Sequence, residues 1–433
     1  MKLQKTIGNF FRLRFSKNSL EKEKVSPWLI LGLFVIFTIF TKPSMPVDDL
    51  LRHLKAHLYN YNYSKLFIYS SFFTYNPYYL FDIVAGFFNR ALPEGMDYRV
   101  IQVIAIFLNG AGVILLTKGM DKNWQCIALC LYLFCIKERL ILARPAIFET
   151  GLFLIAVALC ENKNCSNITH LMLGILMASF YHAFYIYLLP LIIFRRIYLV
   201  PLLVGITGWS IYAGSEYLET FTSLSKLSLP VEKSLKATEN YSVIWIVVTG
   251  IALIPIALKW KENIKRTLCF VYFLLGNQLK FANPLIGLSV SFAKYFNYNN
   301  IRFSYLSLAL VMTTTILSPV HNVQKFPFKY AFEKDSKIFC DDMTTMFSAV
   351  YHSKVPIKIS PSAALTTIKP EILRAMVTMK EKGKFDCKLL EKYYFDYVVE
   401  HSLKEIPQCL KLKAVWGKYR VWKTEVKNSE SNR

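Results

Sequence analysis

Long apolar runs separated by short polar stretches dominate the first three quarters of the chain. About 20 apolar residues are needed to cross a bilayer as a helix, and several of these runs are shorter. The pattern predicts about eleven spanning helices. This count depends on how many spans residues 267–302 contain. The runs lie near residues 26–42, 100–117, 124–136, 146–160, 168–181, 184–194, 197–213, 243–258, 267–281, 284–296 and 303–320.

The segment between the first two runs, residues 43–98, has a different pattern and is called the first-loop segment. Its stretch LFDIVAGFFNRAL, residues 80–92, has apolar residues at helical spacing together with Asp82 and Arg90. This spacing is typical of an amphipathic helix at a membrane interface, and the Tyr-rich flanks suit the headgroup level. We expect such a helix to lie in the outer interface and to close one side of a lipid-facing cavity.

Residues 322–433 contain no further long apolar run. Three short stretches read as strands, SKVPIKISP, FDYVVE and YRVWKTEV, and KPEILRAMVTMKEKG reads as a helix. About a hundred residues are enough to bury a core. We therefore expect a small soluble α/β domain at this end of the chain.

Composition favours a membrane protein. Of the 433 residues, 54% are hydrophobic and 15% aromatic, whereas charged residues make up 19% and fall short of the quarter usual in soluble domains. The predicted fold is an all-α polytopic membrane protein, with the membrane domain at residues 26–321 and the small C-terminal α/β domain after it.

The charge pattern sets the expected orientation. The formal net charge is +23, but the basic residues lie in short clusters beside apolar runs, which favours lipid headgroups or an anionic substrate over nucleic acid. Residues 1–25 are basic and partly amphipathic, so we expect them in the cytoplasm. A cleaved signal peptide is the rival interpretation, but no small-residue cleavage site follows the first run. Alternation of the spans then places residues 322–433 outside, in an oxidising compartment where one disulfide among Cys340, Cys387 and Cys409 is expected with three pairings open.

The most concentrated group of ionisable residues follows the first run. Asp48, Asp49, Arg52, His53 and His57 lie within ten residues. On a helix that begins near Asp48, Asp49 and the two His residues share one face at four-residue spacing. Asp48 would then lie at the start of the helix, where a purely structural role is the alternative, because an Asp at that position commonly caps the helix.

This arrangement resembles the GT-C superfamily of integral membrane glycosyltransferases. The resemblance rests on VDDLLRH at residues 47–53, directly after the first span, and on LARPAIFE at residues 142–149. It implies transfer of a sugar from a polyprenyl-phosphate carrier to a glycan or protein acceptor on the extracytoplasmic face, here of a bacterial inner membrane. In that superfamily the first-loop acid acts as general base or holds a metal. Where two acids are adjacent the first is often essential, which corresponds to Asp48, and residue spacing alone does not separate it from Asp49.

Further candidates would act on the donor phosphate or line the cavity. Arg side chains suit phosphate because the planar guanidinium donates two hydrogen bonds at once. Ionisable side chains within apolar runs are costly and usually face a cavity or a partner. The candidate substrate-binding residues are Arg52, His53, Lys137, Arg139, Arg144, Glu149 and His182. Each has a structural alternative: an interfacial anchor for the cations, an ion pair with Arg144 for Glu149, and a hydrogen bond between helices for His182.

A divalent cation such as Mg²⁺ or Mn²⁺ is a further candidate ligand, held by Asp49, His53 and His57, since His residues four apart face the same way. The sequence has no phosphate-binding glycine loop and no G-x-S-x-G motif, so nucleotide hydrolysis and most serine chemistry are excluded. Two other classes remain. A polymerase or ligase of the O-antigen kind would release a polyprenyl diphosphate, and a lipid-glycan transporter would show paired halves with interrupted helices.

Overall fold

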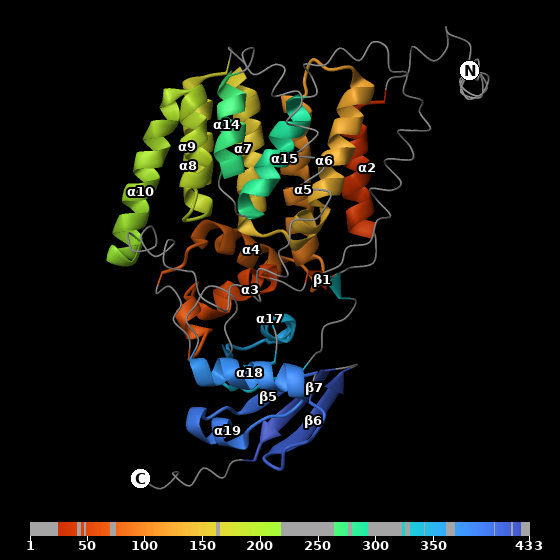
Figure 1. Cartoon of the computed structure of the whole chain (residues 1–433), viewed down its shortest axis with the longest axis vertical. Helices are drawn as coiled ribbons and strands as arrows, with labels where there is room; N and C mark the ends of the chain where they lie inside the picture. The colour runs from red at the N-terminus through yellow and green to blue at the C-terminus, as the bar shows by residue number, and fades with distance from the viewer. Residues whose placement is uncertain are drawn as a thin grey trace, which may run out of the picture.

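The computed structural model has a layer of helices, a C-terminal sheet domain, and the first-loop segment between them (Figure 1). It describes residues 25–40, 45–46, 49–69, 75–161, 165–217, 264–275, 279–292, 323–324, 330–341, 343–360, 369–401, 403–416 and 419–425. Residues 1–24, Asp48 and the apolar runs at 243–258 and 303–320 lie outside the described residues.

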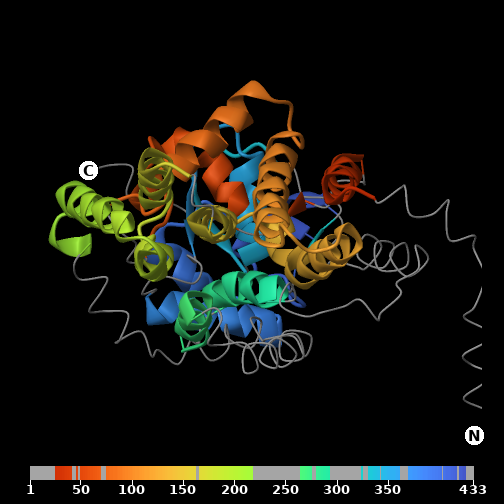
Figure 2. The same cartoon turned by 90° about the horizontal axis from the view of Figure 1, so that it is seen from above.

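Nine of the described helices run along the long axis of the molecule, and the view from above shows them grouped over the C-terminal domain (Figures 1 and 2). They correspond to nine of the apolar runs. Their bounds are α2 Pro27–Phe40, α5 Asp97–Leu116, α6 Lys122–Leu142, α7 Pro145–Glu161, α8 Asn167–Phe180, α9 Tyr185–Phe194, α10 Leu199–Ala213, α14 Ile264–Leu275 and α15 Leu279–Phe292, with a short 3₁₀ turn at Arg196–Tyr198 before α10.

Small and polar residues hold the centre of this layer. Helices α5 and α7 approach so closely that a Cβ on Gly151 would lie 2.8 Å from the Cβ of Leu108. Asn109, on α5, donates to the Ile147 carbonyl at 2.9 Å and accepts from the Tyr132 hydroxyl at 2.7 Å. These buried polar groups are therefore satisfied, and they connect α5, α6 and α7.

The expectation of about eleven spanning helices in an all-α fold is wrong for the described residues. Only two segments among them are long and apolar enough to cross a membrane, Asp97–Leu116 and Arg196–Ala213. Most of the other helices are shorter than a full span, and α6, although it has 21 residues, includes Lys137, Glu138 and Arg139. The described residues also contain a five-stranded sheet, so the chain is an α/β mixture.

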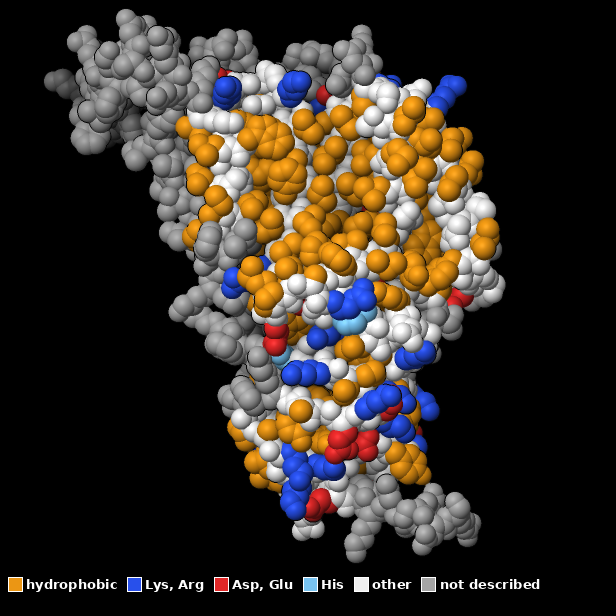
Figure 3. Space-filling model, turned by 180° about the vertical axis from the view of Figure 1, so that it is seen from behind, with side chains coloured by type: hydrophobic (Ala, Val, Ile, Leu, Met, Phe, Trp, Pro, Cys, Tyr) orange, Lys and Arg blue, Asp and Glu red, His pale blue; other side chains and the backbone are white. Residues whose placement is uncertain are grey.

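Exposed hydrophobic side chains nevertheless cover the outside of the helical layer. Seen from behind, they form an almost continuous surface, with Lys and Arg at the upper rim and mixed charges over the C-terminal domain (Figure 3). We call this surface the apolar belt. It includes Leu29, Leu33, Ile36, Phe107, Leu131, Ile168, Met172, Leu189, Ile193, Leu203, Val204, Leu268 and Val271.

The first-loop segment lies across the lower end of the helical layer (Figure 1). Its elements are β1 Met45–Pro46, α3 Leu50–Lys55, 3₁₀ turns at Ala56–Tyr59 and Tyr63–Lys65, and α4 Tyr79–Ala91. Helix α4 confirms the helix predicted from LFDIVAGFFNRAL and buries Phe81, Asp82, Ala85 and Gly86.

The C-terminal domain is a mixed sheet with three helices. Its strands lie in the order β4-β3-β5-β7-β6, with β4, β3 and β5 parallel and the other neighbouring pairs antiparallel. The predicted strands and the predicted helix at KPEILRAMVTMKEKG are all present. The bounds are β3 Lys337–Cys340, α17 Met343–His352, β4 Lys358–Ser360, α18 Pro370–Lys382, α19 Cys387–Tyr393, β5 Tyr397–Glu400, β6 Leu410–Trp416 and β7 Tyr419–Thr424.

Hydrogen bonds attach this domain to the first-loop segment. Ile68 N donates to the Ile359 carbonyl at 3.0 Å, and Ile359 N donates to the Leu66 carbonyl at 2.8 Å, so the first-loop segment pairs with β4. The Tyr351 hydroxyl on α17 donates to Asp97 at 2.8 Å. The first-loop segment and the C-terminal domain consequently lie on the same side of the helical layer.

Candidate functional site

An ion pair lies at the start of α3, where the sequence places its densest ionisable group. Asp49 is the residue before α3, but its side chain makes no capping hydrogen bond. It accepts instead from Nε of Arg52 at 3.2 Å. Burial acts to raise the pKa of the Asp49 carboxyl, but the nearby guanidinium groups of Arg52 and Arg144 outweigh burial and hold this pKa well below its ordinary value. Asp49 is therefore ionised and does not cap α3, whereas the capping alternative named for Asp48 falls outside the described residues.

Two tyrosine rings enclose the Arg52 guanidinium. Its central carbon lies 4.5 Å from the ring centroid of Tyr63 and 5.3 Å from that of Tyr78, and only 2% of the residue is exposed. Burial raises the pKa of Tyr78 to about 12, so its hydroxyl keeps its proton. Tyr78 in turn stacks on Tyr181, with ring centroids 5.3 Å apart. Arg52 is thereby restrained in one orientation between aromatic faces.

A second carboxylate is completely buried beside this pair. Asp82, on α4, accepts from Nδ1 of His53 at 2.5 Å, from the Tyr63 hydroxyl at 2.5 Å and from the Asn76 amide at 2.7 Å. Because a carboxylate accepts from Nδ1, the proton of neutral His53 lies on Nδ1 and Nε2 is left as the acceptor. This Nε2 is buried and has no hydrogen-bond partner among the described residues. Burial lowers the pKa of His53, although Asp82 opposes this effect, so the ring is neutral near pH 7.

The predicted metal set is not brought together. Helix α3 ends at Lys55 and continues as a 3₁₀ turn, so the four-residue spacing no longer places His57 on the face of Asp49 and His53. His57 Nδ1 donates to the Leu54 carbonyl at 3.1 Å, while His53 is turned to Asp82. Among the residues that the structure describes, no three His, Cys, Asp or Glu side chains are placed to hold a metal ion.

Two of the predicted cations, Arg52 and Arg144, lie near Asp49. Arg144 lies between α6 and α7 and acts electrostatically on both Asp49 and Tyr78. Lys137 and Arg139 lie on the last turns of α6, close before Arg144 along the chain.

Glu149 and His182 have different surroundings. Glu149, on α7, is completely buried, and neither carboxylate oxygen has a hydrogen-bond partner among the described residues, so the suggested pair with Arg144 is wrong. His182 lies between α8 and α9, and its hydrogen-bond partners Tyr75 and Pro77 lie in the segment before α4, so these hydrogen bonds join two non-helical segments and not two helices. Its Nδ1 shares a hydrogen bond of 2.9 Å with the Tyr75 hydroxyl, and its backbone N–H donates to Pro77 at 3.0 Å.

Four residues of the site were not predicted from the sequence: Tyr63, Asn76, Tyr78 and Asp82. Only Asp82 could have been predicted from the sequence, because it is an ionisable residue in the apolar stretch LFDIVAG, and such residues usually face a cavity or a partner. The aromatic and amide partners had no such signal, because Tyr is frequent throughout the first-loop segment.

The site thus combines an ionised carboxylate, two guanidinium groups and a neutral histidine with an oriented ring. It can accept a proton and hold an anion at the end of the helical layer. No protein-family model, curated protein or solved structure matches this chain.

Proposed function

We propose that the protein is a glycosyltransferase that moves a sugar from a polyprenyl-phosphate carrier to a glycan or protein acceptor. The observation that carries the proposal is the ion pair between Asp49 and Arg52, with Arg144 near enough to lower the pKa of the same carboxyl. Sugar transfer from a lipid phosphate needs a group that takes the acceptor proton and cations that stabilise the departing phosphate. These groups are adjacent here.

In the proposed reaction an acceptor hydroxyl oxygen attacks the anomeric carbon of the sugar. The bond from that carbon to the phosphate oxygen breaks, and the phosphate leaves with the electron pair beside the guanidinium groups. The acceptor proton passes to Asp49, whose lowered pKa keeps it ionised. Attack from the face opposite the phosphate inverts the anomeric configuration. Asp48 remains the second candidate base and lies outside the described residues.

The surroundings of the site support a lipid-linked donor. The first-loop segment adjoins the end of the apolar belt, so an apolar carrier chain lying along the belt would bring its phosphate to the level of Arg52 (Figures 1 and 3). Large exposed apolar surfaces mark contacts with membranes or with other proteins. We propose that the belt contacts lipid.

The side of the membrane is also a proposal. Cys387 and Cys409 form a disulfide in the C-terminal domain. Structural disulfides persist in oxidising compartments. This bond supports an extracytoplasmic location for the domain and, with it, for the adjoining site.

The test is sugar transfer by the purified full chain in lipid nanodiscs. A panel of polyprenyl-phosphate monosaccharides, labelled in the sugar, is mixed with lipid-linked glycan acceptors, and the release of polyprenyl phosphate is measured. We expect release with one donor, and a weaker donor affinity for Arg144→Gln. The control Lys118→Gln removes a positive charge beyond the opposite end of α5 and should leave transfer unchanged.

Two results would contradict the proposal. One is the absence of transfer from every monosaccharide phosphate while the protein remains folded. The other is release of polyprenyl diphosphate from an oligosaccharide donor, which is the reaction of a polymerase or ligase.

A further inference from the structure

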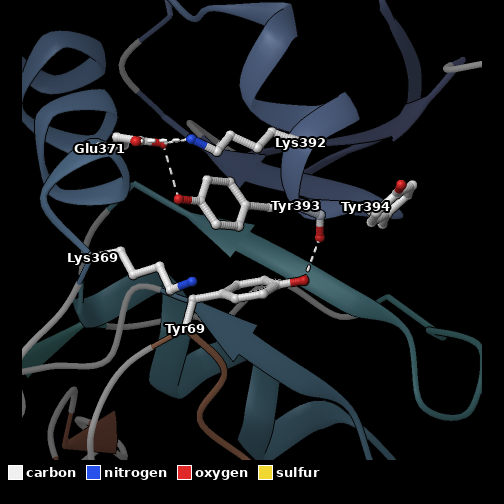
Figure 4. Close-up of a pocket in the computed structure, with 6 residues that line it drawn as sticks. All are labelled: Tyr69, Lys369, Glu371, Lys392, Tyr393 and Tyr394. Carbon is white, nitrogen blue, oxygen red and sulfur yellow. Dashed lines mark hydrogen bonds and ion pairs between the residues drawn. The ribbon is translucent and has the colours of Figure 1, made fainter.

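A cleft of about 530 Å³ opens on the C-terminal domain, where the first-loop segment meets α18 and α19 (Figure 4). Tyr69 lines it from the first-loop segment. Lys369 and Glu371 line it at the start of α18, and Lys392, Tyr393 and Tyr394 line it at the end of α19. Three aromatic rings and three charged groups therefore meet in one depression, formed by parts of the chain that are far apart in sequence.

Hydrogen bonds hold the walls of the cleft. The Tyr69 hydroxyl donates to the Tyr393 carbonyl at 2.5 Å, and their ring centroids lie 4.8 Å apart. The Tyr393 hydroxyl donates to Glu371 at 3.0 Å, and Lys392 donates to the same carboxylate at 2.7 Å. Figure 4 shows these side chains converging from both sides. The rings of Tyr69 and Tyr393 are thus held in place by hydrogen bonds from their own hydroxyl groups.

Two of the three tyrosines have unfavourable backbone conformations. Tyr69 has φ +59° and Tyr394 has φ +53°, in the left-handed region that bulky residues seldom adopt. Tyr394 is also 60% exposed, although it is a large aromatic residue. Strained positions of this kind concentrate at functional sites. Both occur in the same cleft, which favours a binding role for the rings.

The charges favour an anionic ligand. Lys392 forms an ion pair with Glu371, so the charges of these two side chains cancel. Lys369 Nζ lies 5.9 Å from the Tyr69 centroid and 5.5 Å from the Tyr393 centroid. Lys337 Nζ lies 5.9 Å from the Tyr69 centroid. Among the described residues, neither Lys369, which lines the cleft, nor Lys337, which lies beside Tyr69, takes part in an ion pair.

We propose that this cleft binds an acidic saccharide. A sugar ring has an apolar C–H face that packs on an aromatic ring, as the exposed Tyr394 offers. It also has hydroxyl groups that donate hydrogen bonds to a carboxylate, as Glu371 offers. A carboxylate on the sugar would pair with Lys369, which lines the cleft. Binding is independent of the transfer reaction; the further role, holding an acidic unit of the glycan acceptor, rests on the proposed function.

The experiment measures binding to the full chain in detergent by titration calorimetry. The probes are trigalacturonate, its neutral counterpart galactotriose, and triglutamate as an acidic peptide. We expect trigalacturonate to bind at least about tenfold more tightly than either other probe, a ratio that one well-placed charge pair and one stacking contact supply.

Variants identify the groups responsible. Tyr394→Ala and Lys369→Gln should each weaken trigalacturonate binding by about tenfold, whereas Tyr394→Phe keeps the ring and should retain binding. The matched charge control is Lys384→Gln, because Lys384 lies two residues beyond the other end of α18, its side chain is 60% exposed, and it pairs with Glu405. It should bind like the unaltered protein.

Several outcomes overturn the proposal: no binding of trigalacturonate, equal binding of galactotriose, equal or tighter binding of triglutamate, or variants at Tyr394 and Lys369 that bind normally. Transfer is measured separately with the same preparations. Binding without transfer contradicts only the proposed function, and transfer without saccharide binding contradicts only this inference.

Discussion

Asp82 on α4 accepts a hydrogen bond of 2.5 Å from Nδ1 of His53 on α3, and 29 positions in the sequence separate the two residues. This contact packs α4 against the helix that carries Asp49 and Arg52. It also sets which ring nitrogen of His53 is left as an acceptor. The geometry of the proposed reaction centre therefore depends on a carboxylate that is itself completely buried.

Asp82→Asn should destabilise the fold. The substitution leaves at least one of the donors from His53, Tyr63 and Asn76 without an acceptor in a buried place, at a cost of roughly 2 to 4 kcal/mol in the free energy of unfolding. Thermal unfolding in detergent measures this. Asp335→Asn is the control, because Asp335 is an exposed turn residue at φ +62°, a conformation that Asn tolerates equally. Equal midpoints for the two variants would show that the buried network contributes little.

Stability should fall as the pH drops below about 6.5. Burial lowers the pKa of His53 in the folded protein below the ordinary value of 6.5 in the unfolded chain, so the unfolded state binds more protons between these two values. Protonation therefore favours unfolding, by at most about 1.4 kcal/mol per pH unit. His53→Gln should remove this part of the pH dependence. Unfolding midpoints for both proteins between pH 5 and 8 measure it, and an unchanged slope in the variant would assign the dependence to other groups.

A comparison of Asp49→Asn with Asp386→Ala should distinguish the loss of a general base from the loss of a helix cap. Removal of a general base lowers the rate by about 10² to 10⁴. We expect Asp49→Asn to lose transfer to that extent. The variant should also lose stability, because the buried Arg52 guanidinium loses its carboxylate partner, so the rate is compared per folded protein. Asp386 does cap α19, accepting from Lys388 N at 3.0 Å. Asp386→Ala should therefore cost about 1 kcal/mol of stability and leave transfer intact.

The same comparison extends to Asp48. If Asp49→Asn, Asp48→Asn and the double variant all retain near-normal transfer, the carboxylates do not act as the base. Transfer rates and unfolding midpoints are measured on the same preparations, so that a loss of folded protein is not read as a loss of chemistry.

Tyr394→Gly should stabilise the protein while Gly383→Ala destabilises it. Both positions have positive φ, +53° and +68°, and glycine adopts this conformation without the penalty of about 1 kcal/mol that a Cβ brings. A Cβ on Gly383 would also lie 2.9 Å from the backbone nitrogen of Lys404. Chemical denaturation measures both variants. A destabilised Tyr394→Gly would mean that the packing of the ring outweighs the backbone strain.

The disulfide should be accessible to labelling from outside the cell only after reduction. A membrane-impermeant thiol reagent applied to intact cells should label Cys387 and Cys409 once they are reduced, and Cys340 should stay unlabelled because it is completely buried. Labelling of the pair only after permeabilisation would place the domain in the cytoplasm. Replacement of both residues by Ser should cost about 3 kcal/mol, the loop-closure value for a bond of this span.

Local patterns determined most of the secondary structure of this protein. The predicted apolar runs that lie in the described residues coincide with helices, LFDIVAGFFNRAL with α4, and KPEILRAMVTMKEKG with α18, because helical spacing and strand alternation are properties of neighbouring residues. The concentration of Asp49, Arg52 and His53 after the first run was likewise visible in the sequence. This concentration of charged residues could be predicted because the residues are neighbours in the sequence.

Tertiary structure decided what those residues contact. Whether an apolar run is a full span depends on where its helix ends and what covers it, so the predicted count failed for the described residues although the helices are present. Residue spacing predicts a metal set of Asp49, His53 and His57, but the change from α-helix to 3₁₀ turn at Ala56 turns His57 away, and His53 hydrogen-bonds to Asp82 of α4. The cleft joins Tyr69 to Tyr393 across 324 positions, a separation that no local periodicity records, because only the packing of the first-loop segment on the sheet brings the two rings together.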